Sequence, residues 1–307
     1  MAWRSFGGAL LAGALALNAG SFSAASAQQG EKGRTMATHF LTTSEGRIAY
    51  EDVGTGPVVL CVPGLGDLRG EYRYLAPGLV EAGYRVVSMD VRGHGESSVS
   101  WPDYSLAGIG KDIVALARHL DAGPVTVVGT SMAAGAAVWA AAEAPDRIGK
   151  LVLVGPVVRD GGPLWKSQVL SWPFIGPWGP SLWGMFYTTL YPTRKPADFD
   201  AYLHALRTNL GEPGRLAAMR GMIASSKSAA EERLAKVQAP SLIVMGTKDP
   251  DFSEPAVEAK RVADALKSSY VMIEGAGHYP HAEMPEVTTP HLVNFLRKGR
   301  TEGPHGS

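Results

Sequence analysis

The chain has 307 residues, of which 45% are hydrophobic and 19% charged, so it can bury a sizeable core. At this length, one domain with an insertion and two separate domains are equally compatible with the sequence. The 29 basic side chains balance the 29 acidic ones, and neither sign forms a long run. The sequence thus shows no electrostatic footprint for nucleic acid binding, so we expect a globular protein without a nucleic acid partner.

The first 27 residues differ from the rest of the chain. They contain Arg4 as their only charge, an apolar stretch over residues 7–17 and the small triplet Ala25-Ser26-Ala27. This pattern is typical of a signal peptide cleaved near Ala27, and it predicts a periplasmic or secreted protein. A retained N-terminal anchor is the alternative, but the apolar stretch is shorter than the roughly 20 residues of a membrane span, so we expect no stable anchor.

From residue 38 onward, short β-branched runs alternate with stretches of helical period, which predicts an α/β fold with a mostly parallel sheet covered on both faces. An antiparallel pair of strands is expected over 38–42 and 48–53. The remaining expected strands are 58–62, 85–89, 125–129, 151–154, 241–245 and 270–273, and the expected helices are 72–81, 106–120, 132–143, 256–266 and 287–297. The polar tail, 301–307, is expected to be disordered.

Residues 155–236 interrupt this alternation, because they are rich in Trp, Pro and Gly and offer helical stretches without strands. We interpret them as a helical cap inserted between two parts of one core, 28–154 and 237–300. Large aromatic side chains bury much area and line apolar pockets. The candidate substrate contacts in the cap are Trp165, Trp172, Trp183, Phe186 and Tyr187. The alternative is that these rings only attach the cap to the core.

The strongest chemical signal is the segment Gly129-Thr130-Ser131-Met132-Ala133, which joins an apolar strand to an alanine-rich helix. A serine on such a strained turn presents its Oγ at the end of the sheet as a nucleophile. The turn needs small neighbours so that strand and helix approach closely. Gly129 is one of them, and Ala133 adds a methyl group where glycine is usual.

Serine is a weak nucleophile until a base removes its proton, and the base needs an acceptor on its other nitrogen. Asp249 follows the strand 241–245 and is the candidate acceptor, with Asp251 as its rival. His278 lies in a glycine-rich loop after the last expected strand and is the candidate base, with His281 as its rival.

A tetrahedral intermediate also requires donors for its oxyanion. The loop Val62-Pro63-Gly64-Leu65-Gly66-Asp67 follows the first buried strand, and we assign this role to the backbone amides of Leu65 and Met132. His94 precedes the serine in a turn over 90–97 that is interpreted as structural, braced by the charges of Asp90 and Arg92.

The sequence indicates neither a metal nor an organic cofactor. It has no His-x-x-x-His spacing and no cysteine cluster, and Gly64-Leu65-Gly66 lacks the third glycine of a dinucleotide site. Cys61 is the only cysteine and lies in the apolar run 58–62, so it is expected to pack in the core and to form no intramolecular disulfide.

Taken together and in this order, these segments resemble the α/β-hydrolase superfamily over residues 38–296. The oxyanion loop resembles that family's His-Gly loop with Pro63 in place of histidine, the turn 90–97 resembles its Asp-Arg-Gly-x-Gly-x-Ser turn, and Gly277-His278 with Glu283 and Pro285 resembles its histidine segment. The resemblance implies the α/β-hydrolase fold, with an eight-stranded sheet, an inserted cap and the chain order serine, acid, histidine.

The resemblance also limits the reaction. Relatives that open epoxides or cleave carbon–halogen bonds have an aspartate where this chain has Ser131. The expected function is hydrolysis of a carboxylic ester, lactone or thioester of a small apolar substrate through an acyl-enzyme. The alternatives are a receptor for a small hydrophobic ligand, a cofactor-free haloperoxidase or a carbon–carbon bond hydrolase.

Overall fold

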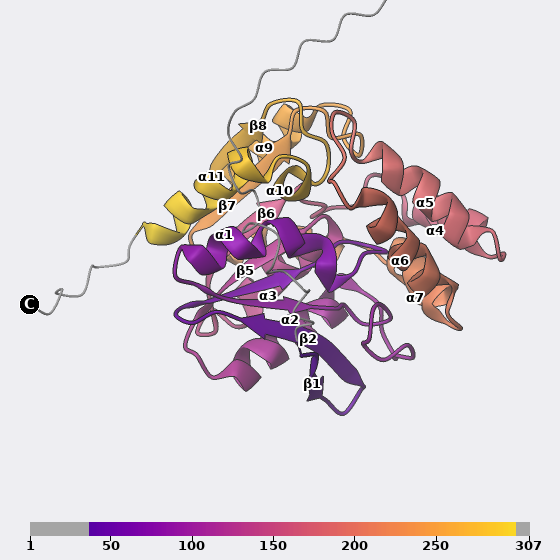
Figure 1. Cartoon of the computed structure of the whole chain (residues 1–307), viewed down its shortest axis with the longest axis horizontal. Coiled ribbons are helices and arrows are strands. Elements are labelled where there is room, and N and C mark those ends of the chain that lie inside the picture. The colour runs from indigo at the N-terminus through magenta and orange to yellow at the C-terminus, as the bar shows by residue number, and fades with distance from the viewer. Residues whose placement is uncertain (1–36, 299–307) are drawn as a thin grey trace, which may run out of the picture. The chain divides into compact units, whose positions relative to one another are not determined.

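The computed structural model describes residues 37–298, in which eight strands form one sheet in the order β1-β2-β4-β3-β5-β6-β7-β8 (Figure 1). The β1–β2 and β2–β4 pairs are antiparallel and all other pairs are parallel. The strands are β1 (His39–Thr42), β2 (Arg47–Val53), β3 (Val58–Val62), β4 (Arg85–Met89), β5 (Val125–Thr130), β6 (Ile148–Val154), β7 (Ser241–Gly246) and β8 (Ser269–Ile273). The predicted fold class is therefore confirmed.

Each face of the sheet buries its own hydrophobic core. Along β3, Val58, Leu60 and Val62 point to one core and Val59 and Cys61 to the other, and all five side chains are buried. Strands that are covered on both faces become continuous apolar runs of this kind. The first core is covered by α2 (Leu106–Leu120), α3 (Met132–Glu143) and α9 (Pro255–Leu266), and the second by α1 (Ala76–Glu81) and α11 (Pro285–Arg297).

The structure differs from the sequence-based expectation in the segment 72–81. A 3-10 helix, η1 (Arg69–Tyr74), comes first, and α1 begins separately at Ala76. Pro77 in the first turn of α1 has no amide hydrogen to continue an earlier helix, and its ring is tolerated at a helix start. The strand expected over 151–154 is also longer, because β6 begins at Ile148 beside an irregularity in its pairing with β5.

Between β6 and β7 the chain forms only helices. They are α4 (Leu164–Ser171), η2 (Trp172–Phe174), α5 (Gly179–Thr189), α6 (Phe199–Gly211), α7 (Arg215–Ala224), α8 (Ser228–Glu231) and η3 (Leu234–Lys236). In Figure 1, α4 to α7 gather on one side of the sheet. They have a separate aromatic core that includes Tyr187, Tyr191 and Phe199 and also takes in Tyr279 from the histidine loop.

Within 37–298, none of the helices is both long enough and apolar enough to cross a membrane. The predicted signal peptide over 1–27 and the predicted disordered tail over 301–307 lie outside the described residues.

Candidate active site

Ser131 lies at the turn between β5 and α3 with φ 55° and ψ −121°, a backbone conformation that residues other than glycine rarely adopt. Three backbone hydrogen bonds hold it there: its amide donates to the Val154 carbonyl at 2.8 Å, and its carbonyl accepts from the amides of Val157 and Ala134, both at 3.1 Å. A Cβ at Gly129 would lie 2.7 Å from the carbonyl oxygen of Ala133. The turn thus has the strained, tightly packed geometry of a nucleophile elbow, and Ala133 fits within it.

His278 and Asp249 form a buried pair, with 2.8 Å between His278 Nδ1 and Asp249 Oδ2. Gly155, at the end of β6, lies against this pair with φ 50°. A Cβ there would lie 2.9 Å from His278 Cε1 and 3.1 Å from Asp249 Oδ2. The backbone of Gly155 therefore packs against one side of the His278–Asp249 pair. Because Nδ1 is engaged with Asp249, Nε2 is the nitrogen of His278 that can act as a base.

The loop that carries His278 is fastened to the cap. The His278 amide donates to the Leu190 carbonyl at 3.0 Å, and the buried Glu283 accepts from the Gly277 amide at 2.6 Å. Glu283 also accepts from the backbone amides of Thr193 and Arg194, at 2.9 and 2.8 Å. Because one carboxylate binds amides from both segments, the position of the base and the position of the cap are linked.

A cavity of about 380 Å³ lies between the strand-end loops and the cap. Ser131 and His278 both line it, as do Leu65 and Met132, whose amides were assigned to the oxyanion, whereas Asp249 lies behind the imidazole. The cavity is completed by Val157, Phe174, Trp183, Phe186, Leu190, Met222, Ile223, Lys227, Asp251 and Tyr279. The candidate nucleophile and base therefore share one apolar chamber.

Asp251 is a second carboxylate in this chamber. Its Oδ2 lies 3.6 Å from His278 Nε2, on the side of the ring opposite to Asp249. Burial raises the pKa of Asp251. Burial alone would lower the pKa of His278, but the charges of Asp249 and Asp251 outweigh it and raise that pKa to about 9. The imidazole therefore holds a proton more tightly than a free histidine does.

Asp249, Asp251 and His278 are also the residues most suited to bind a cation. Their ligand atoms lie within 4.8 Å of one another, the one such group of three among residues 37–298. The Nδ1 of His278 is already engaged with Asp249, so a cation would compete with the pair that orients the base. The group thus belongs to the site already described.

The oxyanion loop approaches the nucleophile closely. A Cβ at Gly64 would lie 3.3 Å from Ser131 Cβ, and the Gly64 amide donates to Glu71 Oε2 at 2.9 Å. Gly66 has φ 66°, and a Cβ there would lie 2.6 Å from the ring of Trp183, whose Nε1 donates to the Gly66 carbonyl at 3.1 Å. Glycine is needed at position 66, whereas a Cβ at position 64 would press on Ser131 Cβ and require a small shift of the loop.

Behind the oxyanion loop lies a buried polar cluster that the sequence analysis did not identify. Asp67 accepts hydrogen bonds from the hydroxyls of Tyr187 and Tyr202, and its pKa is raised to about 7 by burial and by the charge of Glu71. His281 Nε2 lies 3.0 Å from Glu71 Oε1. Within the described residues His281 contacts this cluster and does not line the cavity, so it is not placed to act as the base.

The five aromatic candidates of the cap separate into three groups. Trp183 and Phe186 line the cavity. Tyr187 is fully buried behind it, where its hydroxyl donates to Asp67 at 3.0 Å. Trp165 and Trp172 are exposed on the outer surface and do not reach the cavity. The expectation of substrate contact is corrected for these last three rings, because the amphipathic pattern of a helix does not tell which side faces the pocket.

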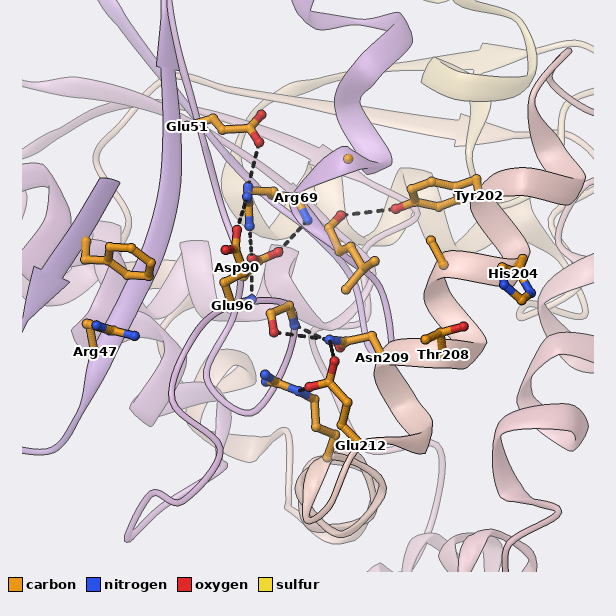
Figure 2. A pocket seen from close by; sticks show the side chains of 16 residues that line it. Arg47, Glu51, Arg69, Asp90, Glu96, Tyr202, His204, Thr208, Asn209 and Glu212 are labelled. Carbon is orange, nitrogen blue, oxygen red and sulfur yellow. Dashed lines mark hydrogen bonds and ion pairs between the residues drawn. The ribbon is translucent and has the colours of Figure 1, made fainter. Parts of the chain in front are cut away.

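A second hollow, of about 770 Å³, lies between η1 and α6 and is shown in Figure 2. At its base Arg69 donates to Glu51 at 2.9 Å and also pairs with Asp90 and Glu96. Arg69, rather than Arg92, is therefore the partner of Asp90. These contacts brace the turn 90–97 as the sequence predicts.

Arg92 and His94 have other partners in this turn. Arg92 binds both carboxylate oxygens of Asp112, at 2.7 and 2.8 Å. His94 is buried with Nδ1 3.2 Å from the Arg92 carbonyl, and burial lowers its pKa to about 4. The second hollow thus lies over a structural turn, and His94 has no part in the catalytic constellation.

Residues 57–285 match the family described as alpha/beta hydrolase fold. The chain belongs to this family. It is 27% identical, over 83% of its length and 92% of the relative, to a 2-hydroxy-6-oxononadienedioate/2-hydroxy-6-oxononatrienedioate hydrolase of Burkholderia vietnamiensis. The structure of a thermophilic esterase from Thermogutta terrifontis is similar with a TM-score of 0.70 and 25% identity, over 86% of this chain and 100% of that one.

Another similarity is restricted to part of the chain. An uncharacterized protein of Mycobacterium tuberculosis is 32% identical over 123 residues, which are 39% of this chain. This alignment spans about a third of the relative, 36% of its length.

Proposed function

We propose that this α/β hydrolase is a serine hydrolase that cleaves the carboxylic ester, lactone or thioester of a small apolar substrate. The observation that carries the proposal is the shared cavity, in which Ser131 on its strained turn lies with His278, the imidazole held by Asp249. The similarity to a solved esterase at 25% identity supports ester chemistry. Export by the N-terminal segment is part of the same proposal.

In the proposed reaction, His278 Nε2 takes the proton of Ser131 Oγ while Oγ bonds to the carbonyl carbon of the substrate. The carbonyl oxygen becomes an oxyanion, which accepts hydrogen bonds from the amides of Leu65 and Met132. The imidazolium then protonates the leaving alcohol or thiol, and an acyl-enzyme remains. Water attacks the acyl carbon with His278 again as base, and the acid and the free serine are released.

The lining of the cavity indicates the substrate class. Most of its side chains are apolar, and polar substrate groups would be left without partners among them. Lys227 is the cation at the lining, but its Nζ donates to the Met222 and Ile223 carbonyls, both at 3.1 Å, and to that of Ser225. The Lys227 ammonium is thus engaged by the carbonyls at the end of α7. Because the rest of the lining is mostly apolar, we expect the substrate to carry a short or medium acyl chain.

The test is the hydrolysis of p-nitrophenyl butyrate by the wild type and by Ser131→Ala. We expect the variant to lose at least about a thousandfold in kcat, as other serine hydrolases do when the nucleophile is removed. Ser88→Ala is the matched control, because Ser88 on β4 has the same exposed fraction of 8% as Ser131. A fluorophosphonate should label the wild type at Ser131 only. Unchanged turnover in Ser131→Ala would refute the proposal.

A second candidate is hydrolysis of a carbon–carbon bond, favoured by the 27% identity to the Burkholderia hydrolase over most of both chains. Both reactions would use the same serine and histidine. A panel of esters, lactones and vinylogous diketones separates them by the relative kcat/KM, and a receptor would show ligand binding without steady turnover.

A further inference from the structure

The outer surface of the cap carries an apolar patch. Trp165, Val169 and Trp172 follow each other at spacings of four and three residues, so they share one face of α4 and the start of η2, and all three are exposed. Among the side chains that the structure describes, eleven large hydrophobic ones are exposed, and seven of these lie between residues 165 and 186. We call these seven the cap patch: Trp165, Val169, Trp172, Ile175, Trp178, Met185 and Phe186, each with 40–70% of its surface exposed.

Contacts between rings join the cap patch to the catalytic cavity. The indole of Trp178 donates to the Pro173 carbonyl at 2.9 Å. Next to it, Phe174 packs edge-on against Trp183, with centroids 5.9 Å apart, and Trp183 lies 5.3 Å from Phe186. Phe186 belongs both to the exposed patch and to the lining of the cavity. The patch is therefore continuous with a wall of the chamber that holds Ser131.

The chain segment that carries the cap patch has basic charges only. From residue 161 to residue 197 the sequence contains no acidic residue, whereas it contains three basic ones. Two arginines from neighbouring helices reach the patch: Arg207 donates to Ser181 Oγ at 2.8 Å and Arg220 to the Ser171 carbonyl at 3.2 Å. Neither arginine has an acidic partner among residues 37–298. An apolar surface with tryptophans is thus bordered by free positive charge.

We propose that the cap patch docks on the surface of an anionic lipid bilayer and that the catalytic cavity receives its substrate from there. Tryptophan rings favour the boundary between lipid headgroups and acyl chains, and arginines beside them attract anionic headgroups. A second copy of this chain would bind the cap patch less favourably, because the arginines beside its own patch would face those of the first copy. The delivery of substrate rests on the proposed ester hydrolysis, whereas the docking does not.

The test is co-sedimentation of the full chain with vesicles of phosphatidylcholine, with or without phosphatidylglycerol. We expect the wild type to bind the anionic vesicles about tenfold or more tightly than the neutral ones, with a blue shift of tryptophan emission. The variant Ile175→Ser/Trp178→Ser/Met185→Ser should lose at least about tenfold of this binding, because three exposed apolar side chains are removed from the lipid contact. Its hydrolysis of soluble p-nitrophenyl butyrate should stay at the wild-type rate.

Two further variants complete the design. Val169→Ser/Ile175→Ser/Met185→Ser keeps the hydrogen bond of Trp178 and should also lose binding, which guards against local misfolding in the first variant. Tyr270→Ser/Val287→Ser removes exposed apolar side chains outside the cap and should bind as the wild type does.

Equal binding by the wild type and both cap variants, or no binding by the wild type, would overturn the docking proposal. A dimer in light scattering that dissociates in the cap variants, without vesicle binding, would overturn it in favour of a second copy. Vesicle binding without hydrolysis of any ester would contradict only the proposed function.

Discussion

One wall of the cavity is made of loops at the ends of strands, and the opposite wall is made of side chains from cap helices. In the loop wall, glycines stand close to the catalytic groups: a Cβ at Gly155 would collide with His278, and a Cβ at Gly64 would press on Ser131 Cβ. In the cap wall, Trp183 and Phe186 contribute rings that other apolar groups could replace. The loop wall therefore does not accept an added Cβ without a change in the catalytic geometry. The cap wall accepts a different apolar side chain, and its shape sets which substrate fits.

Among the changes that distinguish the two walls, the largest effect is expected from Gly155→Ala, which tests the loop wall. The new Cβ would meet His278 Cε1 at 2.9 Å and displace the imidazole, and a displacement of about 1 Å lowers kcat about a hundredfold. Gly123→Ala is the control, since Gly123 also has positive φ but has no atom within 4 Å of such a Cβ. Both variants should lose stability in urea through the positive φ, Gly155→Ala the more because its Cβ also collides with the buried pair, and only Gly155→Ala should lose kcat. Equal kcat in the two variants would show that the loop wall tolerates a Cβ beside the imidazole.

An intermediate effect is expected from Asp251→Asn, and it appears in the pH dependence. The base must be neutral, so kcat/KM rises with pH as His278 loses its proton, near its pKa of about 9. The Asp251 carboxylate helps to raise that pKa. Its removal therefore moves the rising limb of the pH profile of kcat/KM to lower pH and increases kcat/KM at pH 7 several-fold. Asp251→Glu keeps the charge and should keep the limb. A limb that stays in place or moves upward in Asp251→Asn contradicts the role of this carboxylate.

The smallest effect is expected from Phe186→Ala, which tests the cap wall. Loss of the ring lengthens the cavity, so the preference among acyl p-nitrophenyl esters should move to longer chains by about tenfold in relative kcat/KM, with little change in the best kcat. Tyr270→Ala removes an aromatic side chain of similar exposure from β8 and should leave the preference unchanged. A large loss of kcat for every ester would show that the cap wall also positions the catalytic groups.

The sheet was predictable because its signal is local. Apolar runs such as 58–62 and 125–129 are bounded by turn residues, and the strands observed there begin at the expected residues. The break between η1 and α1 was missed although Pro77 marks it, because the apolar period continues across the proline. The start of β6 at Ile148 depends on its pairing with β5. Such a contact between distant segments cannot be predicted from the hydrophobic pattern of one segment.

The catalytic candidates were predictable because this fold brings the ends of its parallel strands together, so Ser131 and His278 had to meet at one edge of the sheet. The roles of Asp251 and Glu71 were not predictable, since a carboxylate acquires such a role from its distance to His278 or His281. For the cap rings, the sequence contains the aromatic residues but not the rotation of α4, which turns Trp165 away from the cavity.

The hydrogen bond from the His278 amide to the Leu190 carbonyl has a consequence for engineering. The backbone at the end of α5 therefore holds the residue that carries the base. Glu283 binds the following turn through the amides of Thr193 and Arg194. A chimera that takes its whole cap from another hydrolase would separate His278 from this support. Exchange of the segments before and after residues 187–195 would alter the substrate chamber and leave the base in its native setting.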